Sequence, residues 1–577
     1  MDRNLLLAIV LSVLIIVGFQ YFFNAFAPPT PVNAPSTVEL TKKTETPAKK
    51  ASEEPKVLKE QGKTAPELSS TSTAESVDQN VPGVQAKESL IKIETPKYEA
   101  VLTNIGGKII SFKLKDYTAN LGSPELVNLF PPEGPDTSEP TIRLTRSNEV
   151  FSDAKLVYTS DMKDLSVELD KASPEKSVVF RGVSSSGLVL SKKFTFHADN
   201  YLIDLSYVLE NKSNEDRDYL VTLPLRKYFS DDSKQFSWNS VEVLLDGSLK
   251  DYYFKDVKGE EELSGHVEWA GLGEVYFFKA LTFPRQPAAK VTFLKPTKEG
   301  VAEILVRCGS INIPSGGKST ETQVGLYLGP KEADALQTAG ANLGRALVYS
   351  NYQILNVMSE YLMKFLRFCN SGFTVLGFKV PGTGNYGIDI IILTLLIKIL
   401  FIPLTHKSMK SMKRMQDLQP HIAKLKEKYK DDKSALNKAT MELFRDNKVN
   451  PLGSCWPMFL QIPVFIALYQ ALSYAIELRH AAFLCIPSIY LCIQDLSAPD
   501  PYYVTPILMG GTMVLQQWMT PSAGDPMQKK MMLLMPVVFT YMFLSFPSGL
   551  VLYWLVSNIL SIGQQLLTNR LTARTGI

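Results

Sequence analysis

Cysteine is scarce in this sequence. Its 577 residues include five cysteines, and none stands in a CxxC pair or at a spacing typical of mixed histidine and cysteine ligands. The sequence therefore indicates no metal site, and no cofactor is expected. Cys485 and Cys492 lie in one short stretch of chain, where they either form a disulfide in an oxidising compartment or remain two buried thiols.

A catalytic constellation is also missing. Residues 90–330 contain no nucleophile motif and no metal-ligand spacing. His197, Asp199 and Asp204 stand singly at the expected ends of strands, where polar residues usually belong to turns or to the surface. We therefore do not expect an enzyme.

Charge is nearly absent from residues 388–405, an apolar run about one bilayer thick. The run nevertheless carries Thr394 and Lys398, which are four residues apart and therefore share one face of a helix. A charged side chain at the middle of a bilayer costs about 2.5–3.5 kcal/mol even on a lenient insertion scale. We therefore expect Lys398 to face a wet cavity inside a helical membrane bundle.

The start of the chain contains two unlike segments. Residues 1–27 hold an apolar run that is long enough to span a bilayer. The end of that run imitates a signal-peptidase site, but Pro28 and Pro29 follow directly and favour an uncleaved transmembrane anchor over a cleaved signal. Residues 28–88 are rich in Pro, Ala, Ser, Thr, Lys and Glu, which predicts a disordered linker.

Residues 89–347 have a different pattern. Short stretches of alternating polar and apolar residues recur, and turn residues such as Gly106, Gly107, Gly187 and Gly247 separate them. Many short strands with such punctuation are typical of an all-β sandwich. The last part of this domain, from residue 331, has the pattern of a helix.

Residues 348–385 connect this domain to the apolar half of the chain. Within them, residues 351–368 place apolar and polar side chains on opposite faces of a helix. The apolar face holds Ile354, Leu355, Met358, Leu362, Phe365 and Leu366. Because a membrane span follows directly, we expect a helix in the membrane interface, with packing on the β-domain as the alternative.

Residues 386–577 form the membrane half. Its five apolar spans lie at about 386–405, 455–476, 502–519, 531–547 and 549–568. With the N-terminal anchor they make six spans.

The positive charges of the loops predict the orientation of these spans. The loop of residues 406–453 carries twelve Lys and Arg residues, and the loop of about 477–501 carries one, Arg479. The positive-inside rule therefore puts the first loop and both chain termini in the cytoplasm. The β-domain then lies on the outer side, which is the periplasm in a Gram-negative bacterium.

The basic loop has a helical period of its own. Apolar residues recur every three or four positions, and Asp431 and Asp432 can end one helix and cap a second. We expect a cytoplasmic helical hairpin whose methionine-rich face meets varied apolar partners, or else a pair of solvated helices near anionic lipid. The residues expected to carry the recruitment role are Met409, Met412, Lys413, Arg414, Leu418 and Ile422.

Polar residues also recur inside the later spans. They are Gln461, Thr512, Gln516, Thr540, Ser557, Ser561 and Gln564. Each alone is consistent with a hydrogen bond between helices. Together with Lys398 they indicate a hydrated groove, whose water lowers the cost of the buried lysine.

Three segments of the membrane half resemble a known family. They are KVNPLGSCWPMFLQIPVFIALYQAL from Lys448, DLSAPDPYYVTPILMG from Asp495 and FPSGLVLYWLVSN from Phe546. These segments are similar to the membrane core of the YidC/Oxa/Alb family of membrane protein insertases. The resemblance covers nearly the whole chain and implies the long form of Gram-negative bacteria, with an anchor, a linker, a large periplasmic β-domain, an interfacial helix and five core spans.

The resemblance implies a groove that is open to the cytoplasm and to lipid but closed to the periplasm. The groove arginine of the family falls on Lys398, which keeps the charge but loses the planar fork for bidentate carboxylate binding. Thr394 matches a groove residue of the same helix, and Tyr553 or Trp554 falls where the family has a substrate-contacting aromatic. Pattern and resemblance together give the expected groove residues Lys398, Thr394, Gln461, Gln516, Ser557, Tyr553 and Trp554.

The resemblance also implies partners in the bacterial inner membrane. They are nascent membrane proteins as substrates, the SecYEG translocon with SecDF, ribosomes or targeting factors at the cytoplasmic face, and the lipid bilayer. No specifically bound nucleic acid is expected. The β-domain is similar to the family's sandwich and through it to sugar-mutarotase folds, which does not imply sugar chemistry.

Two other functions compete with insertion. A secondary transporter would be built from internal repeats, and the five core spans show no pair of repeated halves. A membrane-tethered periplasmic enzyme or binding protein would need a constellation of functional residues in the β-domain.

Overall fold

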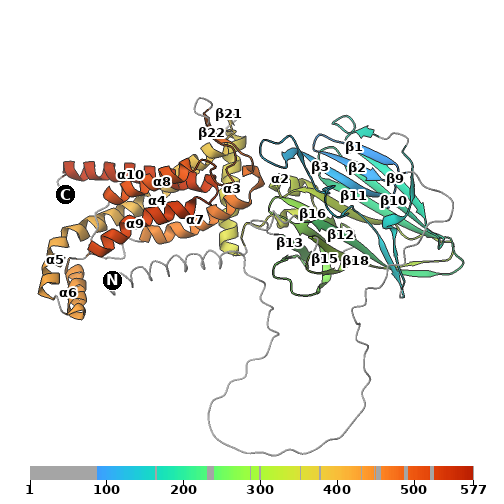
Figure 1. Cartoon of the computed structure of the whole chain (residues 1–577), viewed down its shortest axis with the longest axis horizontal. Helices are drawn as coiled ribbons and strands as arrows, with labels where there is room; N and C mark the ends of the chain where they lie inside the picture. Colours follow the sequence, from blue (N-terminus) through green and yellow to red (C-terminus); the bar gives the residue numbers. More distant parts are fainter. Residues whose placement is uncertain are drawn as a thin grey trace, which may run out of the picture.

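The computed structural model describes residues 88–575, apart from residues 148, 163–165, 230–238, 286–287, 298–299, 351, 376–377, 430–431, 448, 450–455, 487–490 and 520–525. The predicted anchor and all but the last residue of the predicted linker lie outside the described residues. The described chain forms a β-domain and a bundle of helices, which lie side by side along the long axis of the molecule (Figure 1).

The β-domain contains nineteen strands among its described residues. They are β1 (Leu90–Glu94), β2 (Tyr98–Thr103), β3 (Lys108–Thr118), β4 (Leu126–Asn128), β5 (Arg143–Arg146), β6 (Glu149–Ser152), β7 (Tyr158–Ser160), β8 (Ser166–Glu168), β9 (Glu175–Val183), β10 (Leu188–His197), β11 (Leu202–Asn211), β12 (Arg217–Tyr228), β13 (Ser240–Leu245), β14 (Ser248–Tyr253), β15 (Glu261–Gly273), β16 (Phe277–Thr282), β17 (Ala288–Phe293), β18 (Val301–Ile313) and β19 (Thr322–Pro330).

These strands form two sheets around one hydrophobic core. Five strands pair in the order β4-β3-β2-β1-β8. The other fourteen form a second sheet, in which twelve run in the order β6-β5-β12-β18-β17-β15-β16-β19-β11-β10-β9-β7, while β13 pairs with β14 and β15. The predicted all-β sandwich is therefore confirmed.

The alternation that predicted the strands sets which side chains form the core. In β11, Ile203, Leu205, Tyr207 and Leu209 are buried, and the residues between them are more exposed.

The predicted turn at Gly106 has a backbone conformation and surroundings that favour glycine. Its φ of +79° favours glycine, and an added Cβ would lie 2.7 Å from the carbonyl oxygen of Ala154.

Two short helical pieces end the β-domain. The pattern from residue 331 predicts one helix, whereas the structure has α2 (Ala333–Ala339) followed by the 3₁₀ helix η3 (Leu343–Ala346). Gly340 separates them with a φ of +72°, a conformation that a helix interior does not use.

The membrane half contains eight helices within the described residues. They are α3 (Gln353–Ser371), α4 (Tyr386–Asp417), α5 (Gln419–Lys428), α6 (Lys433–Asp446), α7 (Trp456–Tyr474), α8 (Val504–Met519), α9 (Pro526–Phe543) and α10 (Ser548–Thr575). The five predicted core spans fall on α4, α7, α8, α9 and α10. By length and composition, Tyr386–Met415 and Ser548–Thr568 are the described stretches able to cross a membrane, and the apolar parts of α7 and α9 are shorter.

Helix α3 packs on the helical bundle, mainly against α7 and α4. Ser359 of α3 is buried and donates a hydrogen bond of 2.8 Å to the carbonyl oxygen of Ala467 in α7. Packing on the β-domain, the alternative raised by the sequence, is therefore not the main arrangement. Of the predicted apolar face, Leu355 and Leu366 are buried in the bundle, whereas Ile354 is 76% exposed.

Helix α4 is longer than the span predicted at its start. It continues without a break from the apolar run through Met409, Met412, Lys413 and Arg414 to Asp417. The predicted first helix of the hairpin is therefore wrong at its beginning. Pro420 stands in the first turn of α5, where a proline is tolerated but cannot extend the preceding helix, so the chain breaks there.

Helices α5 and α6 pack together beyond this break. Asp432 caps α6 as the sequence predicts, by accepting a hydrogen bond of 2.9 Å from the amide of Ala435. Leu418 and Ile422 are buried, whereas Lys413 and Arg414 are exposed. The pair lies at the end of the bundle remote from the β-domain (Figure 1).

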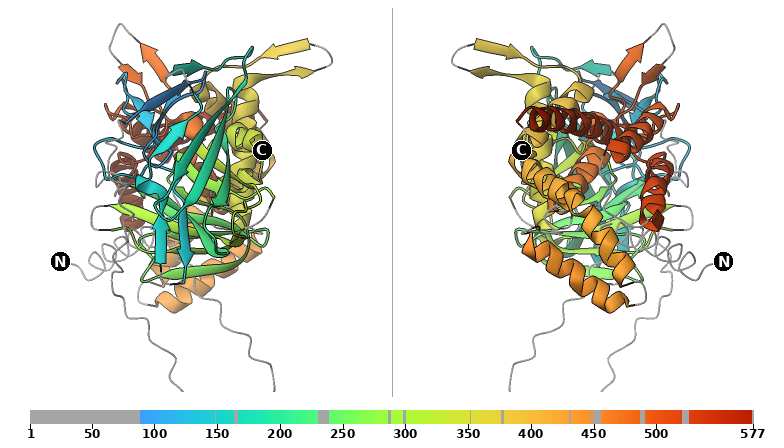
Figure 2. Two further views of the ribbon diagram at one scale, coloured as in Figure 1. Left: turned by 90° about the vertical axis from the view of Figure 1, so that its right-hand side faces the viewer. Right: turned by 90° about the vertical axis from the view of Figure 1, so that its left-hand side faces the viewer.

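Two β-hairpins lie at the end of the bundle that faces the β-domain. They are β20–β21 (Gly372–Val375 and Phe378–Pro381) and β22–β23 (Phe483–Ile486 and Leu491–Ile493), and both lie at the top of the two views of Figure 2, where they point away from each other. A disulfide between Cys485 and Cys492 joins β22 to β23, which decides between the two alternatives that the sequence left open.

Candidate functional site

Side-chain hydrogen bonds join α4 to α10 in the middle of the bundle. Lys398 Nζ donates to Ser561 Oγ at 2.7 Å. Two turns further along α4, Gln564 Nε2 donates to Thr405 Oγ1 at 2.8 Å. The cation that the sequence singled out therefore points toward another helix of the bundle.

The partner of Lys398 is a neutral group. Ser561 Oγ accepts from the lysine and donates in turn to the carbonyl oxygen of Ser557 at 2.8 Å. Among the described residues, no carboxylate forms an ion pair with Lys398, whose side chain is half-buried. The positive charge at this position is thus hydrogen-bonded but not neutralised.

Thr394 shares the face of Lys398 but uses its hydroxyl locally. The side chain is fully buried, and Oγ1 donates a hydrogen bond of 2.6 Å to the carbonyl oxygen of Ile390 one turn earlier. This bond satisfies the hydroxyl inside α4 itself.

The predicted aromatic residues lie on α10 in two different settings. Tyr553 is buried, and its hydroxyl accepts a hydrogen bond from Gln461 Nε2 of α7. Trp554 is half-buried, and its ring lies 5.0 Å from that of Phe465 in α7 and 5.2 Å from that of Phe543 in α9. The two neighbours therefore anchor α10 to α7 and α9 by different means, one polar and one aromatic.

Two polar residues of α10 escaped the sequence analysis. Asn558 Nδ2 donates to Thr512 Oγ1 of α8 at 3.3 Å, and Gln565 Nε2 donates to the carbonyl oxygen of Met519 at 2.8 Å. They are seven residues apart and therefore share one face of α10, a spacing that could have identified them. Gln516, which was predicted, lies half-buried in α8.

Helix α10 is thus the centre of the polar contacts in the bundle. Ser561 and Gln564 face α4, Tyr553 faces α7, and Asn558 and Gln565 face α8. The structure brings Lys398 together with Ser561 and the backbone of Ser557, but joins Gln461 to Tyr553 in a separate contact.

The β-domain contains buried charges that serve its packing. Lys192 is fully buried, forms an ion pair of 2.5 Å with Asp153 and donates to the carbonyl oxygens of Gly106 and Pro140. Burial lowers the pKa of Lys192, although Asp153 opposes this effect. These contacts fasten β10 to the loops that cover it.

His197 and Asp204 form a pair at the surface of the β-domain. His197 Nε2 lies 2.9 Å from Asp204 Oδ2 at the surface, and this hydrogen bond raises the pKa of His197. Within the part of the chain that the structure describes, no three His, Cys, Asp or Glu side chains come together where a metal ion could bind.

Comparisons with known proteins give two family matches that together span most of the chain. Residues 90–364 match the family described as YidC periplasmic domain, and residues 378–575 match the family described as 60Kd inner membrane protein. The two matches correspond to the β-domain with α3 and to the remaining helical bundle.

Similar proteins match from end to end. The membrane protein insertase YidC of Syntrophus aciditrophicus is 38% identical over 587 residues, which cover 99% of this chain and 100% of that protein. The membrane protein insertase YidC of Geobacter metallireducens is 37% identical over 576 residues, with 99% and 98% coverage. A crystal structure of an active YidC insertase with its first transmembrane domain resolved covers 84% of this chain and 93% of that one at 18% identity, with a TM-score of 0.36 that is too low to carry an argument.

Proposed function

This chain belongs to the YidC family of membrane protein insertases, and we propose that it moves hydrophobic segments of new proteins into the inner membrane past the contact between α4 and α10. Its relatives along the whole chain are insertases, which argues against the secondary transporter and the tethered periplasmic binding protein.

The uncompensated charge of Lys398 carries this proposal. Moving about twenty apolar residues from water into lipid is downhill, so the barrier lies in the polar flank that must accompany them. Among the described residues, Lys398 is held by the Ser561 hydroxyl and by no carboxylate, so it can attract the acidic flank of a substrate without first losing a carboxylate partner. Lysine lacks the fork of arginine, so we expect attraction without a fixed geometry.

The groove around Lys398 is part of the proposal. Its wall would include Gln461, Gln516, Ser557, Tyr553 and Trp554, with Thr394 at its buried side. On its other side α4 exposes Leu395, Leu396, Ile399 and Leu400, a continuous apolar surface that suits contact with lipid. A substrate segment would then have a polar and an apolar surface beside each other.

The same proposal extends to the topology. We infer six spans, with both termini and the pair α5–α6 in the cytoplasm and the β-domain in the periplasm. The support is that α5–α6 and the β-domain lie at opposite ends of the bundle (Figure 1) and that the loop of residues 406–453 carries twelve positive charges.

The partners follow from this placement. Exposed Lys413 and Arg414 at the end of α4, together with α5–α6, would receive ribosomes carrying nascent chains or targeting factors. Work beside the SecYEG translocon with SecDF rests on the family resemblance alone.

Charge variants at position 398 test the role of this residue. The full chain, reconstituted in liposomes, would insert a single-span substrate with an acidic flank. We expect Lys398→Arg to retain insertion, Lys398→Ala to lose about tenfold in rate and Lys398→Glu to lose more, because about 1.4 kcal/mol of attraction corresponds to a tenfold change. Lys364→Ala, which removes an exposed cation of α3, serves as the matched control.

A second substrate shows whether the position 398 variants act through their charge or through altered structure. When the acidic flank is replaced by Asn and Gln, the differences among the position 398 variants should largely disappear. Equal insertion of the acidic substrate by all three variants would remove Lys398 from the mechanism.

A further inference from the structure

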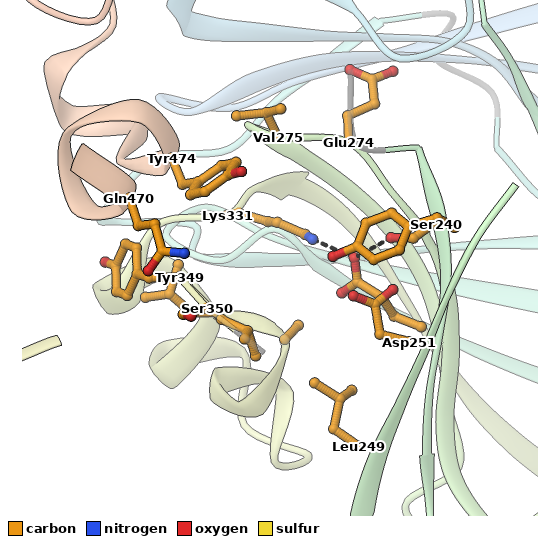
Figure 3. Close-up of a pocket in the computed structure, with 15 residues that line it drawn as sticks. Ser240, Leu249, Asp251, Glu274, Val275, Lys331, Tyr349, Ser350, Gln470 and Tyr474 are labelled. Carbon is orange, nitrogen blue, oxygen red and sulfur yellow. Dashed lines mark hydrogen bonds and ion pairs between the residues drawn. The ribbon is translucent and has the colours of Figure 1, made fainter. Parts of the chain in front are cut away.

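A polar cavity lies where the β-domain meets the helical bundle (Figure 3). Its volume is about 50 Å³, and it is partly open to the outside. Glu242, Asp251 and Lys331 line it from the β-domain, Tyr349 lines it from the connector after η3, and Gln470 and Tyr474 line it from α7. In Figure 3, Gln470 and Tyr349 lie across the cavity from Asp251, with Lys331 reaching between them. We call this space the interdomain cavity.

The charges of the interdomain cavity do not balance. Lys331 Nζ bonds to Glu242 Oε1, which also accepts from Ser240 Oγ at 3.0 Å. Lys331 is also the positive charge that acts on Asp251, so Glu242 and Asp251 share one lysine. Burial, and then the neighbouring Glu242, raise the pKa of Asp251 to about 6, which still leaves the carboxyl largely ionised at neutral pH. Glu274 at the rim has its own partner, because Lys227 Nζ lies 2.9 Å away. One negative charge therefore remains uncompensated.

The unsatisfied atoms of the cavity are oxygens. Glu242 Oε2, Asp251 Oδ1 and Gln470 Oε1 have no hydrogen-bond partner in the described part of the chain, nor has the hydroxyl of Tyr349. Glu242, Gln470 and Tyr349 are each at most 5% exposed. Buried polar atoms without partners are costly, so a site with this lining favours a ligand that brings hydrogen-bond donors and a positive charge.

The chemistry and the size restrict that ligand. Glu242 and Asp251 line the interior of the cavity and Glu274 lies at its rim, and no three His, Cys, Asp or Glu side chains of the described chain come together for a metal ion. A primary ammonium group carries one positive charge and three N–H donors, which matches one excess charge and three free acceptor oxygens. A volume of about 50 Å³ admits a few water-sized groups, enough for a small ammonium head but not for a sugar.

We propose that the interdomain cavity binds a primary ammonium group, supplied by the headgroup of an aminophospholipid or by a soluble amine. Its three N–H donors would bond Glu242 and Asp251 of the β-domain and Gln470 of α7 together, and so fasten the two parts of the molecule. The lipid source is favoured by position, because Gln470 and Tyr474 form the end of α7, a membrane helix of the insertase.

Thermal unfolding of the full chain in phosphatidylcholine nanodiscs tests the proposal. One arm adds phosphatidylethanolamine to the nanodiscs, a second adds ethanolammonium chloride, and a third adds tetramethylammonium chloride at equal ionic strength. Tetramethylammonium and the choline headgroup carry the charge but no N–H donor. We expect a rise in midpoint of about 3 °C or more with a primary ammonium source and none with tetramethylammonium.

Variants connect the response to the cavity. Asp251→Asn removes the excess charge at nearly constant shape, so it should abolish the ammonium response while keeping or raising the midpoint of the ligand-free protein. Gln470→Leu should weaken the response from the side of α7. Glu262→Gln, which removes a carboxylate paired with Lys290 outside the cavity, should respond like the unchanged protein.

Each outcome either identifies the source of the ammonium group or tests whether the cavity binds one. A response to phosphatidylethanolamine alone identifies the lipid, and a response to ethanolammonium alone identifies a soluble amine. The proposal is overturned by an equal response to tetramethylammonium, by no response to either primary ammonium source, or by a full response of Asp251→Asn.

Discussion

At the scale of single residues, Glu139 shows how burial sets the charge of a side chain. The residue is fully buried in the β-domain, and Oε2 accepts a hydrogen bond of 3.2 Å from the amide of Thr141. Oε1 has no partner among the described residues. Burial raises the pKa of Glu139 to about 8, against the opposing positive charges of Arg226 and Lys279. The carboxyl is therefore mainly protonated at neutral pH.

This protonation predicts a loss of stability as the pH rises toward about 8. Because the pKa of Glu139 in the folded protein lies above its unfolded value, its contribution to stability is complete below the unfolded pKa and is lost progressively as the pH rises to about 8. Between the two pKa values the loss approaches about 1.4 kcal/mol per pH unit, and above the folded value it levels off. Glu139→Gln should remove this part of the loss between about pH 5 and pH 8, as measured by thermal unfolding of the full chain.

A surface carboxylate supplies the control for this measurement. Glu149 is exposed in β6, so Glu149→Gln should keep the pH-dependent loss of the unchanged protein. The same loss in Glu139→Gln would show that another group is responsible.

Lys398 contrasts with Glu139, because its side chain keeps its charge. Its charge is retained at a site where charge is costly, and its partner is the hydroxyl of Ser561. A buried cation with an acidic partner would have a structural function, whereas a cation with a neutral partner keeps its attraction for a passing carboxylate. The insertion experiments on position 398 therefore measure a property of one side chain.

At the scale of elements, close helix packing in the bundle depends on small residues. Gly510 of α8 faces Thr540 of α9, and a Cβ added at Gly510 would lie 2.1 Å from Thr540 Oγ1. Thr540 Oγ1 itself donates to the carbonyl oxygen of Pro536 at 2.7 Å, so it is not free to move away. Small residues allow membrane helices to approach closely, and this pair sets the distance between α8 and α9.

A methyl group at this contact should therefore be costly. We expect Gly510→Ala to destabilise the helical bundle by about 1–3 kcal/mol, because overpacking forces the helices apart. Gly511→Ala is the matched control, since nothing lies within 4 Å of a Cβ at that position. Unfolding of both variants in the same detergent measures the difference.

A second substitution should restore the packing. Thr540→Ala removes the atom that a Cβ at position 510 would meet, so the double variant should be more stable than Gly510→Ala alone. Equal stability of the Gly510→Ala and Gly511→Ala variants would contradict this account of the contact between α8 and α9.

At the scale of the whole molecule, one residue of the segment between α7 and α8 joins the two parts. Arg479 donates a hydrogen bond of 2.9 Å to the carbonyl oxygen of Ala119. Its guanidinium carbon lies 5.8 Å from the ring centre of Tyr276 and 5.7 Å from that of Phe277. Tyr276 in turn reaches Ser497 with a hydrogen bond of 3.3 Å. The positive charge of Arg479 thus helps to attach the β-domain to the membrane half.

Loss of this side chain should loosen the attachment. We expect Arg479→Ala to weaken the interface by about 1–2 kcal/mol, the sum of a cation–π contact and a hydrogen bond. Hydrogen exchange of the full chain should become faster around residues 119 and 276–277 while the interior of the β-domain stays protected. Arg146→Ala, which removes a surface pair with Glu215, is the control and should leave this exchange pattern unchanged. A similar change in both variants would count against a role of Arg479 at the interface.

The sequence predicted most of the elements because their patterns are local. Period-two alternation identified the sandwich, apolar runs located the five core helices, and Asp432 marked the start of α6. The error fell where local patterns compete. Pro420 divides a helical period that continues across it, so the first helix of the predicted hairpin begins at the wrong residue.

The interdomain cavity shows what local patterns cannot reveal. Glu242 and Gln470 line the same space although 228 residues separate them, the difference between the two numbers. Neither residue belongs to a motif, and their juxtaposition depends on how the β-domain sits on α7.

The sequence by itself determined that a charge lies in the middle of an apolar helix, because composition and length fix what a bilayer accepts. It also determined the sequence family and the division into a β-domain and a helical bundle. Only the tertiary structure decided which group Lys398 meets, because its partner Ser561 is 163 residues away. Contacts between such distant residues depend on the packing of whole helices, which local periodicity does not encode.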